Sequence, residues 1–212
     1  MGISEALGCT GIAVEDRYLD LARVRALHEC LHERRARGDF SEARIGRDKT
    51  LQLNPGVRGD LTCWLSEPLF AAERELLSGL EQLRLQLNRD LFLGLFELEL
   101  HYAWYPPGAG YARHVDQPLG STARRVSLIL YLNEAWPCGA GGELELCDEQ
   151  GASRRIEPLA GRLVCFLSEG REHAVLAAQQ DRFSVTGWFR ARDGVRCSLR
   201  GSASGGLLSR AE

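Results

Sequence analysis

Glu97-Leu-Glu-Leu-His-Tyr-Ala-Trp104 alternates polar and apolar side chains over most of its length, which is typical of a β-strand with one buried face. Many short strands joined by glycine- and proline-bearing turns favour a double-sheet barrel or jelly roll over a doubly wound parallel sheet. A site inside such a barrel is expected near its mouth. The further predicted strands are residues 126–132, 142–147, 162–167 and 182–189.

Two helices are predicted before these strands, at residues 14–37 and 68–88. They are expected to pack against one sheet and support the barrel from outside. The segment between them contains Gly46, Pro55, Gly56 and Gly59 and is interpreted as a mobile flap. The apolar positions expected to face inward are Leu19, Leu21, Val24, Leu27 and Leu31 in the first helix, and Leu76, Leu77, Leu80, Leu83 and Leu87 in the second.

The motif His114-Val115-Asp116 carries the main chemical signal, because His173 and Arg182 follow it. Residues two apart in a strand point the same way, so His114 and Asp116 are expected to face one interior while Val115 packs behind them. Two imidazoles and one carboxylate can occupy one face of an octahedral metal and leave three positions open, as in non-haem Fe(II) oxygenases. The motif by itself is weak, since a His-x-Asp is more often a hydrogen-bonded surface pair. Arg182 has a similar alternative as a surface ion-pair residue.

The sequence around the motif strengthens the metal interpretation. In their order along the chain, the flanking stretches resemble the catalytic core of the 2-oxoglutarate-dependent Fe(II) dioxygenases. The resemblance is narrower to the prolyl 4-hydroxylase branch, which includes the hypoxia-inducible-factor prolyl hydroxylases and their bacterial relatives, and it spans residues 45–190. These stretches are Tyr105-Pro-Pro-Gly-Ala-Gly-Tyr111, Tyr131-Leu-Asn133, Gly141-Gly-Glu-Leu144, Pro158-Leu-Ala-Gly-Arg-Leu-Val-Cys-Phe166 and Arg182-Phe-Ser-Val-Thr-Gly-Trp188. Arg58-Gly-Asp60, with Trp64 after it, is similar to a loop that covers the protein substrate in the oxygen-sensing hydroxylases.

The resemblance implies a role for each matching residue. His114, Asp116 and His173 would be the catalytic iron ligands. Arg182 would bind the distal carboxylate of 2-oxoglutarate, for which a planar guanidinium fork is suited. The other implied co-substrate residues are Tyr131, Thr186, Tyr105 and Leu144, and the implied substrate-binding residues are Arg58, Asp60, Arg124 or its neighbour Arg125, and Trp188.

The implied activity is that of a peptidyl-prolyl 4-hydroxylase acting on a protein loop, with Fe(II), 2-oxoglutarate, O2 and ascorbate as cofactors and co-substrates. For bacterial relatives the resemblance suggests elongation factor Tu as the substrate. Two alternatives stay open: a hydroxylase of small molecules or free amino acids on the same scaffold, and a non-catalytic sensor of 2-oxoglutarate or metal. Of the remaining histidines, His28 and His32 are interpreted as helix-surface residues, and His101 as a packing or hydrogen-bonding residue.

Length and composition set the wider expectations. The 212 residues, 44% of them hydrophobic, suit one dioxygenase domain at residues 1–197. Its parts are a helical and flap region at 1–95 and a jelly-roll core at 96–192, with a flexible tail at 198–212. A net charge of −3 without a basic run argues against nucleic acid. Seven cysteines without a CxxC pair favour reduced thiols, as in the cytoplasm. No stretch resembles a membrane span or a signal peptide, so binding to membranes is not expected. The protein is expected to be a cytoplasmic monomer.

Overall fold

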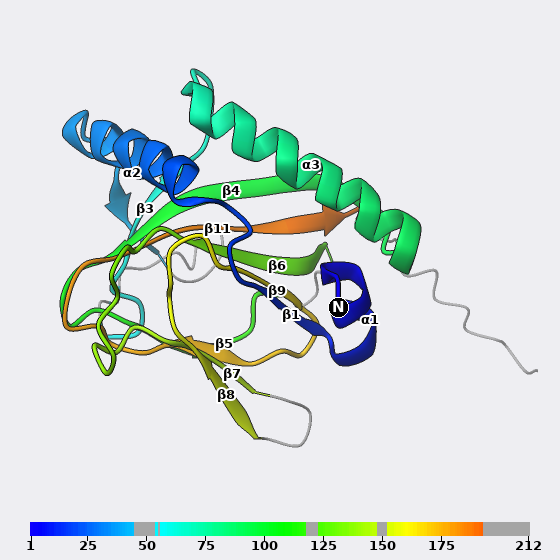
Figure 1. Ribbon diagram of the computed structural model, residues 1–212. Helices are drawn as coiled ribbons and strands as arrows, with labels where there is room; N and C mark the ends of the chain where they lie inside the picture. Colours follow the sequence, from blue (N-terminus) through cyan, green and yellow to red (C-terminus); the bar gives the residue numbers. More distant parts are fainter. Residues whose placement is uncertain (45–53, 55, 118–122, 148–151, 193–212) are drawn as a thin grey trace, which may run out of the picture.

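Two antiparallel β-sheets make up the centre of the protein (Figure 1). The computed structural model describes residues 1–44, 54, 56–117, 123–147 and 152–192. Within these ranges the larger sheet has the strand order β1-β9-β6-β11-β4-β3-β2, and the smaller sheet has the order β5-β10-β7-β8. The predicted double-sheet architecture is confirmed. The strands are β1 (Ile12–Glu15), β2 (Ser41–Glu42), β3 (Leu61–Trp64), β4 (Leu95–Tyr105), β5 (Tyr111–His114), β6 (Arg124–Tyr131), β7 (Leu144–Cys147), β8 (Ser153–Ile156), β9 (Leu163–Leu167), β10 (His173–Val175) and β11 (Arg182–Ala191).

Side-chain alternation divides the central strands between two cores. On β6, Val126, Leu128 and Leu130 belong to the core between the larger sheet and the helices. Ile129 and Tyr131, from the other face of the same strand, belong to the core between the two sheets. Because successive side chains of a strand point to opposite faces, a strand buried on both sides is apolar throughout, as this one nearly is. The space between the sheets is therefore a packed apolar interior, so a polar side chain there needs a polar partner or a function.

Helices α2 (Leu21–Ala36) and α3 (Ala71–Leu91) cover the outer face of the larger sheet, and α1 (Ile3–Thr10) lies beside β1 (Figure 1). The predicted helix at 68–88 is confirmed, shifted by three residues at each end. Its inward leucines Leu76, Leu80, Leu83 and Leu87 are buried, and so are Val24, Leu27 and Leu31 of α2.

The first predicted helix, at residues 14–37, is wrong over its first third. Residues 12–15 form β1, which pairs antiparallel with β9 at the edge of the larger sheet. The helix begins only after Asp20, whose side chain accepts a hydrogen bond of 2.9 Å from the backbone N–H of Arg23. Such an N-cap satisfies a donor that the first turn leaves unpaired, which fixes the start of the helix. Leu21, expected to face inward, is 52% exposed.

A buried ion pair joins α2 to α3. Arg34 donates through Nε and Nη2 to the two carboxylate oxygens of Glu73, both at 2.7 Å. The side chain of Glu73 is fully buried and that of Arg34 is 7% exposed. Burial by itself would raise the pKa of Glu73, but the hydrogen bonds from Arg34 and from the backbone of Phe70 outweigh it, so the pKa is lowered. The pair therefore stays ionised beneath the two helices.

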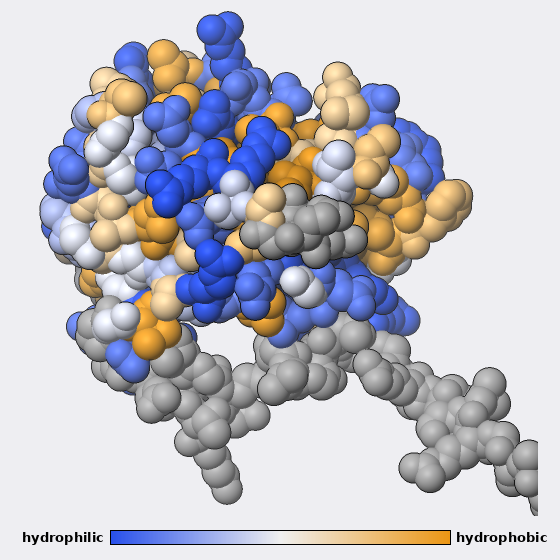
Figure 2. Space-filling model, turned by 90° about the horizontal axis from the view of Figure 1, so that it is seen from below, coloured by the Kyte–Doolittle hydropathy of each residue, from blue (hydrophilic) through white to orange (hydrophobic). Residues whose placement is uncertain are grey.

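The outer face of the smaller sheet carries charged side chains. Glu145 on β7 pairs with Arg113 at 2.7 Å and with Arg155 at 3.2 Å, so the pairs cross from β5 to β8. Figure 2, seen from the side of this sheet, shows hydrophilic side chains over much of the face. The opposite face of the sheet, which meets the larger sheet, is left for the apolar core and for the site described below.

Residues 57–59 link the two sheets. Arg58 forms a β-bridge with Tyr111 of β5, and the backbone of Gly59 donates to Gly110 at 3.0 Å. Two residues later the same chain enters β3, which pairs with β4 in the larger sheet. The Arg58-Gly-Asp60 stretch thus lies where the chain passes from one sheet to the other. Gly46 and Pro55 of the predicted flap, and the predicted tail at 198–212, lie outside the described residues.

Among the described residues, no helix is both long enough and apolar enough to cross a membrane. The six cysteines in the described ranges are all free thiols.

Candidate functional site

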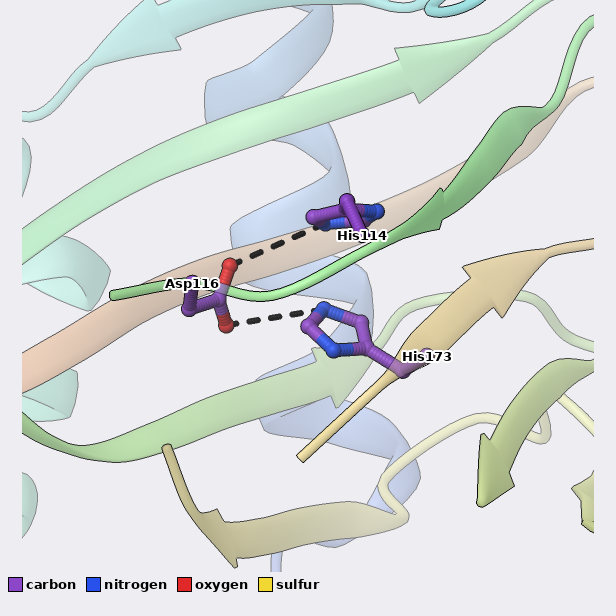
Figure 3. Close-up of side chains that lie close together, drawn as sticks. All are labelled: His114, Asp116 and His173. Atoms are coloured by element: carbon purple, nitrogen blue, oxygen red, sulfur yellow. Dashed lines mark ion pairs between the residues drawn. The ribbon is translucent and has the colours of Figure 1, made fainter. Parts of the chain in front are cut away.

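His114, Asp116 and His173 meet at the end of β5 (Figure 3). His114 is the last residue of β5 and lies directly opposite His173, the first residue of β10. Nε2 of His114 is 3.7 Å from Oδ1 of Asp116, and Nε2 of His173 is 3.5 Å from Oδ2 of the same carboxylate. The three candidate ligand atoms all lie within 4.8 Å of one another. Antiparallel pairing therefore brings residues far apart in the sequence into one group.

Each imidazole ring makes one hydrogen bond through its Nδ1 atom. Nδ1 of His114 lies 2.8 Å from the carbonyl oxygen of Ala112, and Nδ1 of His173 lies 3.1 Å from that of Arg171. A carbonyl can only accept, so the proton of each neutral ring sits on Nδ1 and Nε2 keeps its lone pair. Metal-binding histidines are commonly held in this way by a second hydrogen bond. Both Nε2 atoms point toward the carboxylate of Asp116.

Asp116 is held by a hydroxyl from the larger sheet. Ser127 on β6 donates to Oδ2 of Asp116 at 2.6 Å and lies 2.8 Å from the hydroxyl of Ser168. Burial would raise the pKa of Asp116, but His173, Ser127 and His114 together outweigh it and lower the pKa. Burial, helped by the nearby His173, lowers the pKa of His114 to about 4. At neutral pH the group therefore offers an anionic oxygen and a neutral nitrogen, the forms that bind metal.

One part of the predicted geometry is wrong. The sequence predicts that Val115 packs behind the two ligands, but it is 43% exposed. The reason is that β5 ends at His114, so Val115 and Asp116 lie beyond the paired strand and Val115 has no sheet behind it. The two flanking side chains still converge.

These residues fit a divalent metal such as Fe(II). Two imidazole nitrogens and one carboxylate oxygen form the donor set expected for a non-haem iron with open positions. His173 is buried, and the side chains of His114 and Asp116 are 18% and 10% exposed. In the part of the chain that the structure describes, this is the one group of three or more His, Cys, Asp or Glu side chains close enough to share a metal.

Arg182 lies on the inner face of the larger sheet, at the start of β11, and is 1% exposed. Its Nε donates to the carbonyl oxygen of Gly142 at 2.8 Å, and its guanidinium carbon lies 5.0 Å from the ring centres of both Tyr105 and Tyr131. The hydroxyl of Tyr131 is buried and has no hydrogen-bond partner among the described residues. An unpaired buried hydroxyl costs roughly 1–3 kcal/mol of stability. A carboxylate bound beside Arg182 could accept a hydrogen bond from this hydroxyl and remove that cost.

The remaining predicted pocket residues line the same interior. Thr186 follows Arg182 by four residues on β11 and therefore shares its face, where its Oγ1 lies 3.2 Å from the hydroxyl of Ser184. Leu144, on β7 of the facing sheet, is 1% exposed and packs in the core between the sheets. A buried cation is thus surrounded by apolar walls and a few hydroxyls.

The predicted substrate-binding residues divide into two groups. Arg124 lies beside the cluster of His114, Asp116 and His173, the metal group. Its guanidinium is 3.5 Å from the ring centre of Trp188, and Nη1 donates to the backbone oxygen of Asp116 at 3.3 Å. Arg125 makes no such contact, and its buried Nε has no partner among the described residues. Arg58 and Asp60 bind each other, through hydrogen bonds of 2.7 and 3.0 Å.

Two contacts to the metal group come from residues that sequence reasoning missed. The sequence could have indicated Ser127 as a site residue. It is the one polar side chain in the apolar run 126–130 and lies on the inward face with Ile129. Tyr111 ends one of the stretches that carry the resemblance, but the sequence does not predict its contact with His114, in which the ring centres are 3.5 Å apart. Residues three apart in a regular strand point to opposite faces, so their contact was not expected.

The other histidines lie apart from the metal group, as predicted. His101 is 2% exposed and its ring lies 4.9 Å from Trp64 and 5.5 Å from Trp188. His28 and His32 pack edge to face with each other and with Phe183. A cavity of about 510 Å³ opens between α2 and α3, where Leu27 and Leu76 are among its lining residues. It lies on the helical side of the larger sheet, whereas the metal group lies between the two sheets.

Comparisons with known proteins agree with this geometry. Residues 100–190 match the model of the 2OG-Fe(II) oxygenase superfamily. Human Egl nine homolog 1 is 32% identical over 196 residues, which cover 84% of this chain and 43% of that protein. Human prolyl hydroxylase EGLN3 is 32% identical over 177 residues, covering 80% of this chain and 71% of that protein. The chain spans about half the length of the Egl nine homolog 1 proteins that it matches.

Solved structures show the same likeness. A Pseudomonas putida prolyl-4-hydroxylase superposes with a TM-score of 0.81 at 39% identity, covering 90% of this chain and 97% of that one. A prolyl hydroxylase from Trichoplax adhaerens, solved with a peptide of the hypoxia-inducible factor oxygen degradation domain, gives 0.80 at 25% identity, covering 89% and 87%.

Proposed function

The chain belongs to the 2OG-Fe(II) oxygenase superfamily, where its relatives are prolyl hydroxylases, and on that premise we propose that it is a prolyl hydroxylase acting on a protein loop. The family uses Fe(II), 2-oxoglutarate and O2. The observation that carries the proposal is the buried group of His114, Asp116 and His173 in the same interior as the buried Arg182. We propose that these four residues hold the metal and the co-substrate.

His114, Asp116 and His173 would bind Fe(II) through the two Nε2 atoms and a carboxylate oxygen. When bound together there, Fe(II), 2-oxoglutarate and O2 supply the hydroxylation of a substrate C–H bond, with conversion of 2-oxoglutarate to succinate and CO2. The chain's own residues do the positioning: the backbone carbonyls of Ala112 and Arg171 keep the Nδ1 proton of each ring away from the metal, and Ser127 holds Asp116. The protein thus supplies orientation and a dry interior, while the metal and co-substrate supply the reactivity.

Arg182 would bind the distal carboxylate of 2-oxoglutarate. Its Nε is already engaged by Gly142, which leaves the Nη end of the guanidinium to form charge-assisted hydrogen bonds. Tyr131 would add its unpaired hydroxyl as a further donor. Leu144 and Ile129 would exclude water from the chain of the co-substrate. Tyr105 and Thr186 would complete the pocket on the side of the larger sheet.

A protein substrate is supported by the relatives. The Trichoplax enzyme was solved with a peptide, and the curated relatives include a protein named a prolyl hydroxylase. Arg124 would contact the substrate, because its side chain is 26% exposed and donates to the backbone of Asp116. Trp188, whose ring lies against the Arg124 guanidinium, would contact the substrate beside it. Arg58 and Asp60 would contact the substrate after the ion pair between them rearranges. Elongation factor Tu is the candidate substrate, from the resemblance to bacterial relatives.

The wider expectations also remain proposals. We propose one dioxygenase domain at residues 1–197, with the helical part at 1–95 and the jelly-roll core at 96–192. We also propose a monomer. A reducing cytoplasm is supported by the odd number of cysteines in the sequence.

The test is mass spectrometry of bacterial elongation factor Tu after incubation with the protein, Fe(II), ascorbate and 2-oxoglutarate. The expected result is a gain of about 16 Da on one proline, the mass of one oxygen atom, together with succinate. The His114→Ala variant should give neither product. A matched control is His32→Ala, which removes an exposed histidine of α2 and should leave both products unchanged.

The outcomes separate the alternatives. Succinate without modified elongation factor Tu would keep the oxygenase and redirect the search to other proteins or small molecules. No succinate from any substrate, with Fe(II) bound through His114, would favour the non-catalytic sensor. Activity that survives His114→Ala would overturn the assignment of the metal site.

A further inference from the structure

The imidazole of His114 lies flat against the phenol ring of Tyr111. The ring centres are 3.5 Å apart and the planes differ by 16°. A parallel contact over a full ring face restricts rotation of the imidazole about its χ2 angle, which a single hydrogen bond at Nδ1 controls less well. His114 needs the restriction, because its side chain is 18% exposed whereas that of His173 is 6% exposed.

A β-bulge produces this contact. Across the β5–β10 pair, His114 lies opposite His173 and Tyr111 lies opposite Val175. Three residue steps on β5 therefore match two steps on β10, so β5 carries one extra residue. A bulge of this kind changes the direction of the side chains that follow it, and here it brings Tyr111 and His114 to the same face. Bulges often occur beside active sites, where they re-aim a side chain.

The Arg58–Asp60 pair holds Tyr111 in turn. The guanidinium of Arg58 lies 4.8 Å from the centre of the Tyr111 ring, and the two residues also form a backbone bridge. Arg58 is fixed by two hydrogen bonds to Asp60, whose side chain is fully buried. A guanidinium over an aromatic face is attracted by the negative potential of the ring. The contacts thus run from Asp60 through Arg58 and Tyr111 to His114.

We propose that Tyr111 is a positioning residue for the metal, and that Arg58 and Asp60 hold it in place. Its ring sets the plane of the His114 imidazole so that Nε2 points toward Asp116. The inference rests on the proposed function, since the metal is the one assigned to His114, Asp116 and His173. It gives Arg58 and Asp60 a role within the free protein, in addition to contact with a substrate.

The test measures Mn(II) binding to the protein without 2-oxoglutarate, from the loss of the electron paramagnetic resonance signal of free Mn(II). Tyr111→Phe keeps the ring and should bind Mn(II) like the unmodified protein. Tyr111→Leu removes the ring face and should weaken binding about 10-fold, the low end of the effect of losing a group that orients a metal ligand. Thermal unfolding without metal shows whether each variant is folded.

Two further variants separate positioning from general damage. Tyr18→Leu removes a partly buried tyrosine beside α2 and should leave Mn(II) affinity unchanged. Arg58→Met should weaken binding a few-fold by itself and add nothing to Tyr111→Leu, because it acts through Tyr111. It also carries the test if Tyr111→Leu does not fold.

Equal Mn(II) affinity in the unmodified protein and in either folded Tyr111→Leu or Arg58→Met would overturn the inference and leave the proposed function intact. Equal loss in Tyr111→Phe and Tyr111→Leu would also overturn it, because the ring face would then not be the cause. Mn(II) binding that is absent, or indifferent to Asp116→Ala, would remove the proposed function itself.

Discussion

Ser127 connects the larger sheet to the candidate metal group through one hydroxyl. Removing it in Ser127→Ala leaves Oδ2 of Asp116 without its 2.6 Å hydrogen bond, so the carboxylate can turn away from the two imidazoles. We expect Mn(II) affinity to fall about 10-fold, as is usual for such supporting groups. Ser153→Ala, on the exposed strand β8, is the matched control. An unchanged affinity in Ser127→Ala would show that the histidines alone hold Asp116.

Arg182 can be tested with its charge retained. Arg182→Lys keeps one positive charge but loses the planar fork, and a lysine cannot reproduce both the bond to Gly142 and a two-point contact with a carboxylate. We expect the KM for 2-oxoglutarate to rise at least about 10-fold, which is the loss of roughly 1.4 kcal/mol. Mn(II) binding should not change. Arg155→Lys, on the outer face of β8, should leave the KM as it is.

At the residue scale, the sequence predicts side chains that the chemistry itself requires. His114, Asp116, His173 and Arg182 have types and an order that indicate a metal and a carboxylate. The contact of Tyr111 with His114 could not be predicted, because it depends on an extra residue in β5 that the pattern of apolar side chains does not indicate. Local strand irregularities are set by pairing with a distant partner.

At the scale of the element, β11 depends on a residue without a side chain. A Cβ at Gly187 would lie 1.9 Å from the backbone oxygen of Glu99 on β4. Gly187→Ala should therefore push β11 from β4 and lower the free energy of unfolding by about 3 kcal/mol, the upper part of the usual range for overpacking. Urea unfolding at equilibrium measures this. Loss of less than about 0.5 kcal/mol, the usual effect of a neutral surface change, would contradict the close approach.

Gly79→Ala is the control for that experiment. Gly79 lies in the middle of α3, where an added Cβ would meet the Tyr18 hydroxyl at an ordinary 3.8 Å. Alanine is a better helix former than glycine by up to about 1 kcal/mol, so this variant should be neutral or more stable. The same substitution thus has opposite effects in the two elements.

Helix α2 shows why element boundaries are harder to predict than element types. Residues 14–20 contain enough apolar side chains to extend the helical pattern backward from Val24. They instead reach the edge of the larger sheet, where β1 pairs with β9, and Asp20 caps the helix. The competing partner is about 150 residues away in the chain, beyond any local pattern.

At the scale of the whole molecule, the Arg34–Glu73 ion pair joins α2 to α3 on the outer face of the larger sheet. Arg34→Met leaves the buried Glu73 carboxylate without its partner and should destabilise the protein by about 3–5 kcal/mol. Arg37→Met, which removes an exposed pair with Glu33, should cost less than about 1 kcal/mol. Chemical denaturation at neutral pH compares them. Similar losses in both variants would mean that burial does not set the value of the Arg34–Glu73 pair.

The same pair predicts a pH dependence. The pKa of Glu73 is lowered in the folded protein from an unfolded value of about 4.3, so its contribution to stability is present above that value and is lost as the pH falls through the folded pKa. Between about pH 5 and pH 3, the Glu73→Gln variant should lose stability less steeply than the unmodified protein. Parallel curves of unfolding free energy against pH would contradict the assignment.

The two-sheet architecture was predictable because a half-buried strand and a doubly buried strand each leave a repeating pattern in the sequence. The order of strands in the sheets was not, since β1 and β2 add to opposite edges through pairings that no single stretch encodes. The resemblance to known dioxygenases supplied what the periodicity lacked. The fold and the metal group could thus be predicted. The contacts by which the surrounding strands hold the metal ligands, such as that of Tyr111 with His114, could not.

The pairing of residues 57–59, β5 and β10 also sets the order of assembly. Tyr111 and His114 reach their places only when three distant parts of the chain have come together, and pairing between distant parts of a chain is intrinsically slow. During refolding from denaturant, the ability to bind Mn(II) should therefore return with the slowest change in structure. Metal added at the start of refolding would find no prepared site and would stabilise the finished barrel without hastening its formation.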